Sequence, residues 1–150
     1  MANVVVGQEA PGFTLRDESN QEIALSSLRG APVVLVFYPA DFSPICTSEL
    51  CAIRDDFSAF EAKGAKVFGI SRDTTWAHKA FREKEGFKHS FLADMKGDVA
   101  RLYGCWNEPF DIAERLTVVI DAEGIIGYVV HKPPLEARDH KEALAALGRE

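Results

Sequence analysis

Two cysteines, Cys46 and Cys51, lie five positions apart in the segment YPADFSPICTSELC, residues 38–51. This spacing is not the C-x-x-C of a thioredoxin-like redox pair, and side chains five positions apart on a helix do not face each other. In an ideal helix their Cα atoms would be about 8–9 Å apart, whereas a disulfide needs them within about 7 Å. The two thiols can therefore bond only if the start of the helix unwinds.

The position of Cys46 favours a reactive thiol. The apolar run Val33–Tyr38 predicts a strand buried on both faces, and the loop Pro39–Pro44 leads from it into a helix with Cys46 in its first turn. In open α/β sheets, ligands bind beyond the carboxyl ends of the strands. Free backbone N–H groups and the helix dipole favour a thiolate there, so Cys46 is a candidate nucleophile. The alternative is that Cys46 is a small buried apolar residue.

The cysteine and histidine content argues against a metal site, and we expect no cofactor. The chain has three cysteines, an odd count, and shows no secretion signal, which is typical of a reducing compartment such as the cytoplasm. No second cysteine pair could complete a zinc site, and the four histidines have no ligand spacing. They are His78, His89, His131 and His140.

Composition and charge exclude several other classes of protein. The hydrophobic fraction of 47% and the charged fraction of 27% are typical of a globular chain. The net charge of −6, without a run of basic residues, argues against nucleic acid or an anionic membrane as a partner. The longest apolar runs, near Ala31–Tyr38 and Leu116–Ile120, are too short to span a bilayer.

The apolar pattern changes period along the chain and predicts alternating strands and helices. Two short alternating segments, Phe13–Arg16 and Glu22–Leu25, predict an N-terminal hairpin. The other expected strands are Val33–Tyr38, Lys66–Ser71, Ser90–Asp94, Arg115–Asp121 and Ile125–His131, the last two joined by a turn at Glu123–Gly124. The expected helices run from about Pro44 to Lys63, from Thr74 or Thr75 to Lys84, and over Val99–Tyr103 and Arg138–Leu147.

This order of elements predicts the fold class. Strands that alternate with helices and end in a hairpin imply an α/β fold, with a central mixed sheet covered by helices on both faces. The chain has no internal repeat, low-complexity segment or linker that would divide it. We therefore expect a single domain over residues 1–150.

Pro39, Ser43 and Cys46 form the pattern P-x-x-x-S-x-x-C, which resembles the active-site motif P-x-x-x-T/S-x-x-C of the peroxiredoxins, the alkyl hydroperoxide reductase/thiol-specific antioxidant family. The likeness continues through APGFTLRD, LSSLRG, VVLVFYP, GISRD and RLTVVIDAEGII, and covers residues 4–148. GCWNE, IAERLTVVID and HKPPLEARD most resemble the alkyl hydroperoxide reductase E branch. The resemblance implies a thioredoxin-like fold.

The resemblance also implies a role for each site residue. Cys46 would be the peroxidatic cysteine, which attacks a peroxide oxygen and becomes a sulfenic acid. Ser43 would orient the peroxide, and Pro39 would shield the thiolate from water. Arg115 would stabilise the thiolate and the charge on the leaving oxygen; its alternative is an exposed charge at a strand end. Glu49 would brace an arginine; its alternative is an acidic residue favoured by the helix dipole.

The second cysteine is where two branches of the family differ. The C-x4-C pair resembles the Q-type branch (bacterioferritin comigratory protein-like), in which the second cysteine is the resolving one, so Cys51 would form a disulfide with Cys46. The E branch commonly works with one cysteine and an external thiol. Cys51 as a buried residue on the helix face is a third interpretation.

The expected function is a thiol-dependent peroxidase that reduces hydrogen peroxide and organic hydroperoxides, with a thioredoxin-like or other dithiol as reductant. Two alternatives remain. A thiol–disulfide oxidoreductase would need the missing C-x-x-C, and a peroxide-sensing relay protein would use Cys46 oxidation only to signal to a partner.

The resemblance implies a homodimer as well. Its face would be the loops that carry Phe42, Trp76 and Trp106, because aromatic residues are enriched at interfaces. The alternative places Trp76 and Trp106 in the core, together with Phe81. Cys105, which follows Gly104 in an expected loop, is interpreted as a structural or adventitious residue, the alternative being a disulfide with another cysteine.

Overall fold

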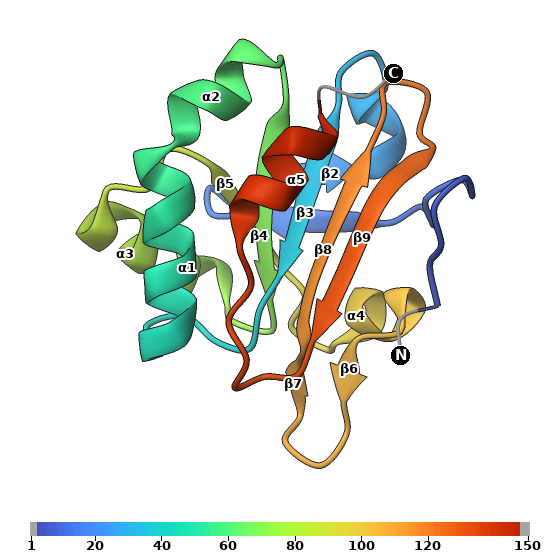
Figure 1. The fold of residues 1–150 in the computed structure, drawn as a ribbon. Helices are drawn as coiled ribbons and strands as arrows, with labels where there is room; N and C mark the ends of the chain where they lie inside the picture. The colour runs from blue at the N-terminus through green and yellow to red at the C-terminus, as the bar shows by residue number, and fades with distance from the viewer. Residues whose placement is uncertain (1–2, 148–150) are drawn as a thin grey trace.

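The computed structural model describes residues 3–147. A seven-stranded sheet forms its centre, in the order β2-β1-β5-β4-β3-β8-β9 (Figure 1). The strands are β1 (Thr14–Asp17), β2 (Glu22–Ala24), β3 (Val33–Phe37), β4 (Lys66–Ser71), β5 (Ser90–Ala93), β8 (Arg115–Ile120) and β9 (Ile126–Lys132). β4 is parallel to both β3 and β5, and the remaining neighbours are antiparallel. The predicted mixed sheet and N-terminal hairpin are confirmed.

Helices cover both faces of this sheet, as predicted. α1 (Pro44–Asp55), α2 (Phe57–Ala62), α3 (Thr75–Glu85) and α5 (His140–Ala146) pack on one face, and α4 (Asp98–Tyr103) with the 3-10 helix η1 (Leu25–Leu28) on the other. Both faces need to be covered because β3 is apolar on both. Val34 and Val36 lie in the core on the α1 side, whereas Val33, Leu35 and Phe37 lie in the core on the α4 side. A strand buried on both faces reads as an unbroken apolar run.

The helix expected over residues 44–63 is wrong in one respect, because it breaks at Asp56. This residue has φ −102° and ψ 14°, outside the helical range, and separates α1 from α2. Its carboxylate lies 2.7 Å from Nε2 of His140 at the start of α5. Aspartate is a weak helix former in a helix interior, and this contact gives the Asp56 carboxylate a tertiary partner.

A small second sheet was not expected from the sequence. β6 (Trp106–Asn107) pairs antiparallel with β7 (Ile112–Ala113), and the hairpin projects beyond the end of the main sheet (Figure 1). Two residues per strand are too few to show the period-2 alternation by which strands are recognised. Asp111, in the connecting turn, has a φ of 53°.

The topology brings two loops to one edge of the sheet. Because β3 and β4 are parallel neighbours, their carboxyl ends meet at the same edge. The loop after β3 leads into α1, and the loop after β4 leads into α3, whose N-cap Thr74 accepts a hydrogen bond from the Ala77 N–H. As predicted, α3 ends at Gly86, where φ is 69°. Among residues 3–147, no helix is long and apolar enough to cross a bilayer.

The core contains a buried histidine that should make stability depend on pH. His89 is 2% exposed and lies against the rings of Phe87 and Phe91, and neither of its ring nitrogens has a hydrogen-bond partner among the described residues. Burial, together with the charge of Arg82, lowers the pKa of His89 to about 3. The unfolded chain, with a histidine pKa near 6.5, binds the proton more tightly, so stability falls as pH drops below about 6.5.

We therefore expect His89 to destabilise the protein in mild acid. Between pH 7 and pH 5 the parent should lose about 2 kcal/mol more unfolding free energy than a His89→Leu variant, which has no group to protonate there. Urea unfolding of the reduced proteins at both pH values measures the difference. Equal losses in the two proteins would show that His89 is not the group responsible.

Candidate active site

Cys46 lies in the first turn of α1, where the loop after β3 enters the helix. Ser43 is the N-cap, in extended conformation, and Pro44 occupies the first helical position. The Ser43 side chain makes no capping hydrogen bond, and the Thr47 N–H bonds to the Ser43 carbonyl. The N–H groups before Thr47 in the helix have no intrahelical acceptor. The start of α1 thus leaves a hydroxyl and backbone donors within one turn of the buried thiol.

The loop before the helix is short and closely held. Pro39 is buried at the end of β3 and has no N–H that would need a partner. Phe42 has a φ of 68°, a left-handed conformation uncommon outside glycine. Between them lies Asp41, which is buried and hydrogen-bonded to neighbouring elements. This loop fixes where the helix, and with it Cys46, begins.

Arg115 and Glu49 form a buried ion pair that joins the sheet to α1. Arg115 is the first residue of β8 and is 2% exposed. Its Nη1 donates to Oε1 of Glu49 at 2.5 Å, and its Nε donates to the Pro134 carbonyl at 2.7 Å. Glu49 follows Cys46 by three positions, so the two share a face of the helix. The carboxylate therefore holds the guanidinium on the side of α1 that carries the thiol.

A second arginine, Arg138, joins this cluster, and the sequence reasoning did not identify it. Its Nε lies 3.3 Å from Oε2 of Glu49, and its backbone N–H donates to the same oxygen at 2.6 Å. Its Nη1 donates to the Thr117 hydroxyl at 3.1 Å. Burial lowers the pKa of the Arg138 guanidinium, while Glu49 and Cys46 act in the opposite direction. Cys46 is therefore within electrostatic reach of Arg138.

The cluster has the electrostatics of an anion-stabilising site. Two buried guanidinium groups share one carboxylate, Glu49, which leaves an excess of positive charge. Positive charge beside a thiol stabilises negative charge on sulfur, and its effect is strong where water is excluded. The charge of Arg138 reaches both Cys46 and Cys105, and of these two thiols Cys46 is the one at the start of α1. The arrangement can support a nucleophilic sulfur and the negative charge that leaves an attacked electrophile.

The other two cysteines occupy different surroundings. Cys51 is half-buried on α1, and its Sγ lies 3.6 Å from Oε1 of Glu85 at the end of α3. Burial raises the Cys51 pKa, and Arg54 partly offsets this shift. Cys105 is fully buried in the core on the α4 side, and burial raises its pKa well above the ordinary thiol value. All three thiols are free.

The three aromatic residues expected on a dimer face differ in exposure. Phe42 is 47% exposed and Trp76 is 80% exposed. Trp106 is half-buried against the core, with the Arg101 guanidinium 4.8 Å from its ring. Trp76 is in the first turn of α3, within the helix expected from the sequence, whereas Trp106 is in β6 and not in a loop.

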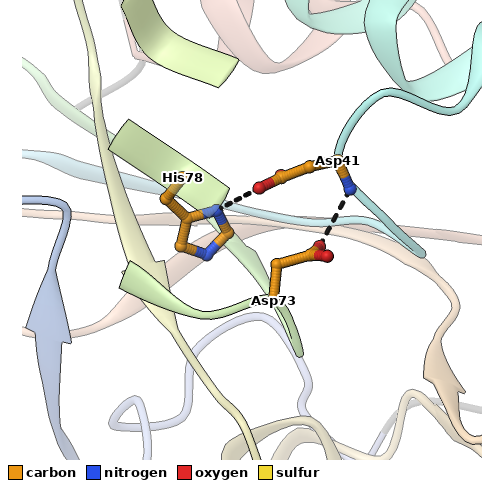
Figure 2. A group of neighbouring side chains, drawn as sticks. All are labelled: Asp41, Asp73 and His78. Carbon is orange, nitrogen blue, oxygen red and sulfur yellow. Dashed lines mark hydrogen bonds and ion pairs between the residues drawn. The ribbon is translucent and has the colours of Figure 1, made fainter. Parts of the chain in front are cut away.

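One group of described side chains has donor atoms close enough to hold a metal ion. Asp41, Asp73 and His78 place one ligand atom each within 4.8 Å of one another. Figure 2 shows that these groups are already hydrogen-bonded to one another, His78 to Asp41 and the Asp41 N–H to Asp73. We therefore interpret the group as a hydrogen-bond network, which the scattered histidines in the sequence did not reveal.

The fold and the site together define a thioredoxin-like protein with a buried thiol at the start of the helix that follows a central strand. Residues 6–129 match the family model described as the AhpC/TSA family. The chain belongs to this family, the peroxiredoxins.

Its relatives come from both branches that the sequence resembles. The chain is 41% identical over 148 residues to alkyl hydroperoxide reductase E of Mycobacterium tuberculosis, a match that covers 95% of this chain and 97% of the relative. It is 38% identical over 130 residues to the chloroplastic peroxiredoxin Q of Suaeda salsa, covering 86% of this chain but only 61% of that relative's length. The solved structure of peroxidoxin BcpB from Mycobacterium tuberculosis superposes with a TM-score of 0.85 at 32% identity, over 95% of each chain.

Proposed function

We propose that the chain is a thiol-dependent peroxidase that reduces hydrogen peroxide and organic hydroperoxides through Cys46. The observation that carries the proposal is the buried Cys46 thiol in the first turn of α1, within electrostatic reach of an arginine–glutamate–arginine cluster. Membership of the AhpC/TSA family supports the same reaction class. A peroxidase assay coupled to a dithiol reductant tests it: steady turnover fits an enzyme, whereas one stoichiometric oxidation would fit the peroxide-sensing alternative.

The residues around Cys46 suggest how the reaction proceeds. The thiolate attacks one peroxide oxygen, the O–O bond breaks, and the sulfur becomes a sulfenic acid while water or an alcohol leaves. Ser43, whose hydroxyl makes no capping bond, is positioned near the helix start to orient the peroxide. Arg115 stabilises the leaving oxygen, and Glu49 holds that guanidinium in place. Pro39 restricts access of water to the sulfur.

We further propose that Cys51 resolves the sulfenic acid by forming a disulfide with Cys46. Both residues lie in the continuous helix α1, so their Cα atoms are about 8–9 Å apart, too far for a disulfide. The start of α1 must therefore unwind, and helix ends are the regions that open at the lowest cost in free energy. Cys51 also has to leave its contact with Glu85 before it can bond to Cys46.

This route predicts two linked changes on oxidation. After one equivalent of peroxide, peptide mapping should find a Cys46–Cys51 disulfide, and amide exchange across residues 43–54 should become faster. A Cys51→Ser variant should react once with peroxide at the parent rate, accumulate sulfenic acid, and overoxidise more readily to sulfinic acid. Liquid chromatography with mass spectrometry reads all of these species.

The rival route uses an external thiol in place of Cys51. It predicts that Cys51→Ser turns over like the parent with small-molecule thiols and that Cys51 stays free in the oxidised parent. A Cys105→Ser variant is the matched control, because Cys105 lies in the core on the opposite face of the sheet from Cys46. A free Cys51 after one clean equivalent of peroxide would exclude the intramolecular route.

We propose a thioredoxin-like or other dithiol protein as the reductant and the cytoplasm as the compartment. The net charge of −6 disfavours nucleic acid or an anionic membrane as a partner. The match over residues 6–129 and the single central sheet support one peroxiredoxin domain across the chain.

A homodimer remains part of the proposal, with a smaller aromatic face than the sequence suggested. Phe42 and Trp76 are exposed and able to contact a partner copy, whereas the half-buried Trp106 packs against the core of its own chain. Sedimentation of the reduced protein, with Trp76→Ser as the variant, tests whether these residues hold two copies together.

A further inference from the structure

Asp41 ties the loop before α1 to two other parts of the fold. Its Oδ1 accepts a hydrogen bond from the Tyr38 hydroxyl, and its Oδ2 lies 2.7 Å from Nδ1 of His78 in α3. Its backbone N–H donates to Oδ2 of Asp73, in the loop after β4, at 2.8 Å. Figure 2 shows Asp41 joined by hydrogen bonds to both His78 and Asp73, which come from the next strand–helix unit of the chain. One loop residue thus has three anchors.

The contacts of the His78 ring show that both of its nitrogens take part in hydrogen bonds with a proton between the two atoms. Nε2 of His78 lies 3.1 Å from the Leu92 carbonyl. A carbonyl oxygen only accepts hydrogen bonds, so Nε2 carries a hydrogen. At 2.7 Å, Nδ1 and Oδ2 must also share a proton, whether it rests on the imidazole or on the carboxyl group. His78 is fully buried and its ring stacks on Phe91, so this geometry is fixed by packing.

The residue after Asp41 shows why the loop needs such anchors. Phe42 has a φ of 68°, a conformation that residues with a side chain rarely adopt. Such conformations persist only where the surroundings over-determine them. Ser43, the N-cap of α1, follows directly, and Cys46 lies three residues further on. If the anchors on Asp41 were lost, the loop could relax and move the start of the helix.

We infer that His78, through Asp41, is a positioning residue for the reaction at Cys46. The Tyr38–Asp41–His78 contacts hold the loop over residues 39–43 in the strained conformation that sets Ser43 and the first turn of α1 in their reactive places. His78 lies in α3 and acts through Asp41, without contact with peroxide. The inference rests on the proposed peroxidase reaction and adds to it a contact between α3 and the active-site loop.

Two substitutions of His78 separate this role from a general contribution to stability. In His78→Asn the side-chain amide nitrogen can take the place of Nδ1 and donate to Asp41, whereas in His78→Gln it can take the place of Nε2 and donate to the Leu92 carbonyl. Each variant therefore keeps one of the two buried hydrogen bonds and loses the other. Both should be destabilised, as measured by urea unfolding, because each loses one buried hydrogen bond.

The two variants should differ in the rate of Cys46 oxidation. Loss of one charge-assisted hydrogen bond changes an equilibrium by roughly 10-fold or more. His78→Gln should lower the second-order rate constant with hydrogen peroxide by about that factor and speed amide exchange across residues 39–46. His78→Asn should stay within about threefold of the parent in both. Rapid mixing with acid quench and mass analysis gives the rate.

Tyr38→Phe tests the same inference if the His78 variants fail to fold, because this variant keeps the buried ring and removes only the hydroxyl that donates to Asp41. It should change rate and exchange in the same direction as His78→Gln. Parent-like rates and exchange in His78→Gln, or equal slowing in both His78 variants, would overturn the inference. If Cys46 of the parent did not react with peroxide, the proposed function would be wrong, and the exchange comparison alone would decide whether His78 holds the loop.

Discussion

Replacing Cys46 by serine is expected to abolish peroxide consumption and leave the fold intact. The hydroxyl is nearly isosteric with the thiol, so the buried site in α1 should stay packed. Serine, however, has no accessible anionic form near neutral pH. Among the described residues, no histidine is hydrogen-bonded at position 46 to act as a base for the serine hydroxyl. Consumption of hydrogen peroxide in the presence of a dithiol should fall to the rate without protein. Circular dichroism would verify the fold.

The remaining thiols provide the controls for this prediction. Cys51→Ser and Cys105→Ser should each retain the first oxidation step, because Cys51 donates to Glu85 away from the arginine cluster and Cys105 lies in the core on the α4 side. If Cys46→Ser kept its activity while Cys51 and Cys105 were present, the assignment of the nucleophile would be wrong.

Replacing Arg115 by methionine is expected to slow the oxidation of Cys46 by about 10²–10³-fold, the usual cost of losing one positioned donor to a developing negative charge. The reason for the expected loss of rate is the geometry at the site, where Arg115 is buried and held by Glu49 and the Pro134 carbonyl. Rapid mixing of the reduced variant with peroxide measures the rate.

Two further variants distinguish a chemical role from a structural one. Arg115→Lys keeps a positive charge but loses the fork of donors, so its rate should lie between those of the parent and Arg115→Met. Arg29→Met removes an exposed arginine paired with Glu9 and should leave the rate unchanged. If Arg115→Met reacted at the parent rate, the Arg115–Glu49 pair would serve only to hold β8 against α1.

The sequence predicted the parts of the fold that depend on local periodicity. The unbroken run Val33–Phe37 indicated a strand buried on both faces, and the loop after it placed Cys46 at the start of a helix. The break at Asp56 escaped notice because the apolar side chains before and after it keep facing the core, so the helical spacing continues across it.

The parts of the site that join distant segments could not be read from the sequence. Arg138 lies 89 positions from Glu49, and His78 lies 37 positions from Asp41. Such contacts depend on which strands are neighbours and on where their loops meet, and one sequence carries no local signal for that. In a sequence, an arginine in a polar segment and a histidine in an amphipathic helix are both typical of surface residues. In the folded chain, the topology buries both side chains.

The most direct test of the account is mass analysis of the reduced protein after one equivalent of hydrogen peroxide, with a sulfenic acid trap added to half of the sample. The account predicts that Cys46 carries the trap in one half and is bonded to Cys51 in the other, with Cys105 untouched. An unmodified Cys46, with peroxide unconsumed or oxidation confined to Cys51 or Cys105, would contradict it.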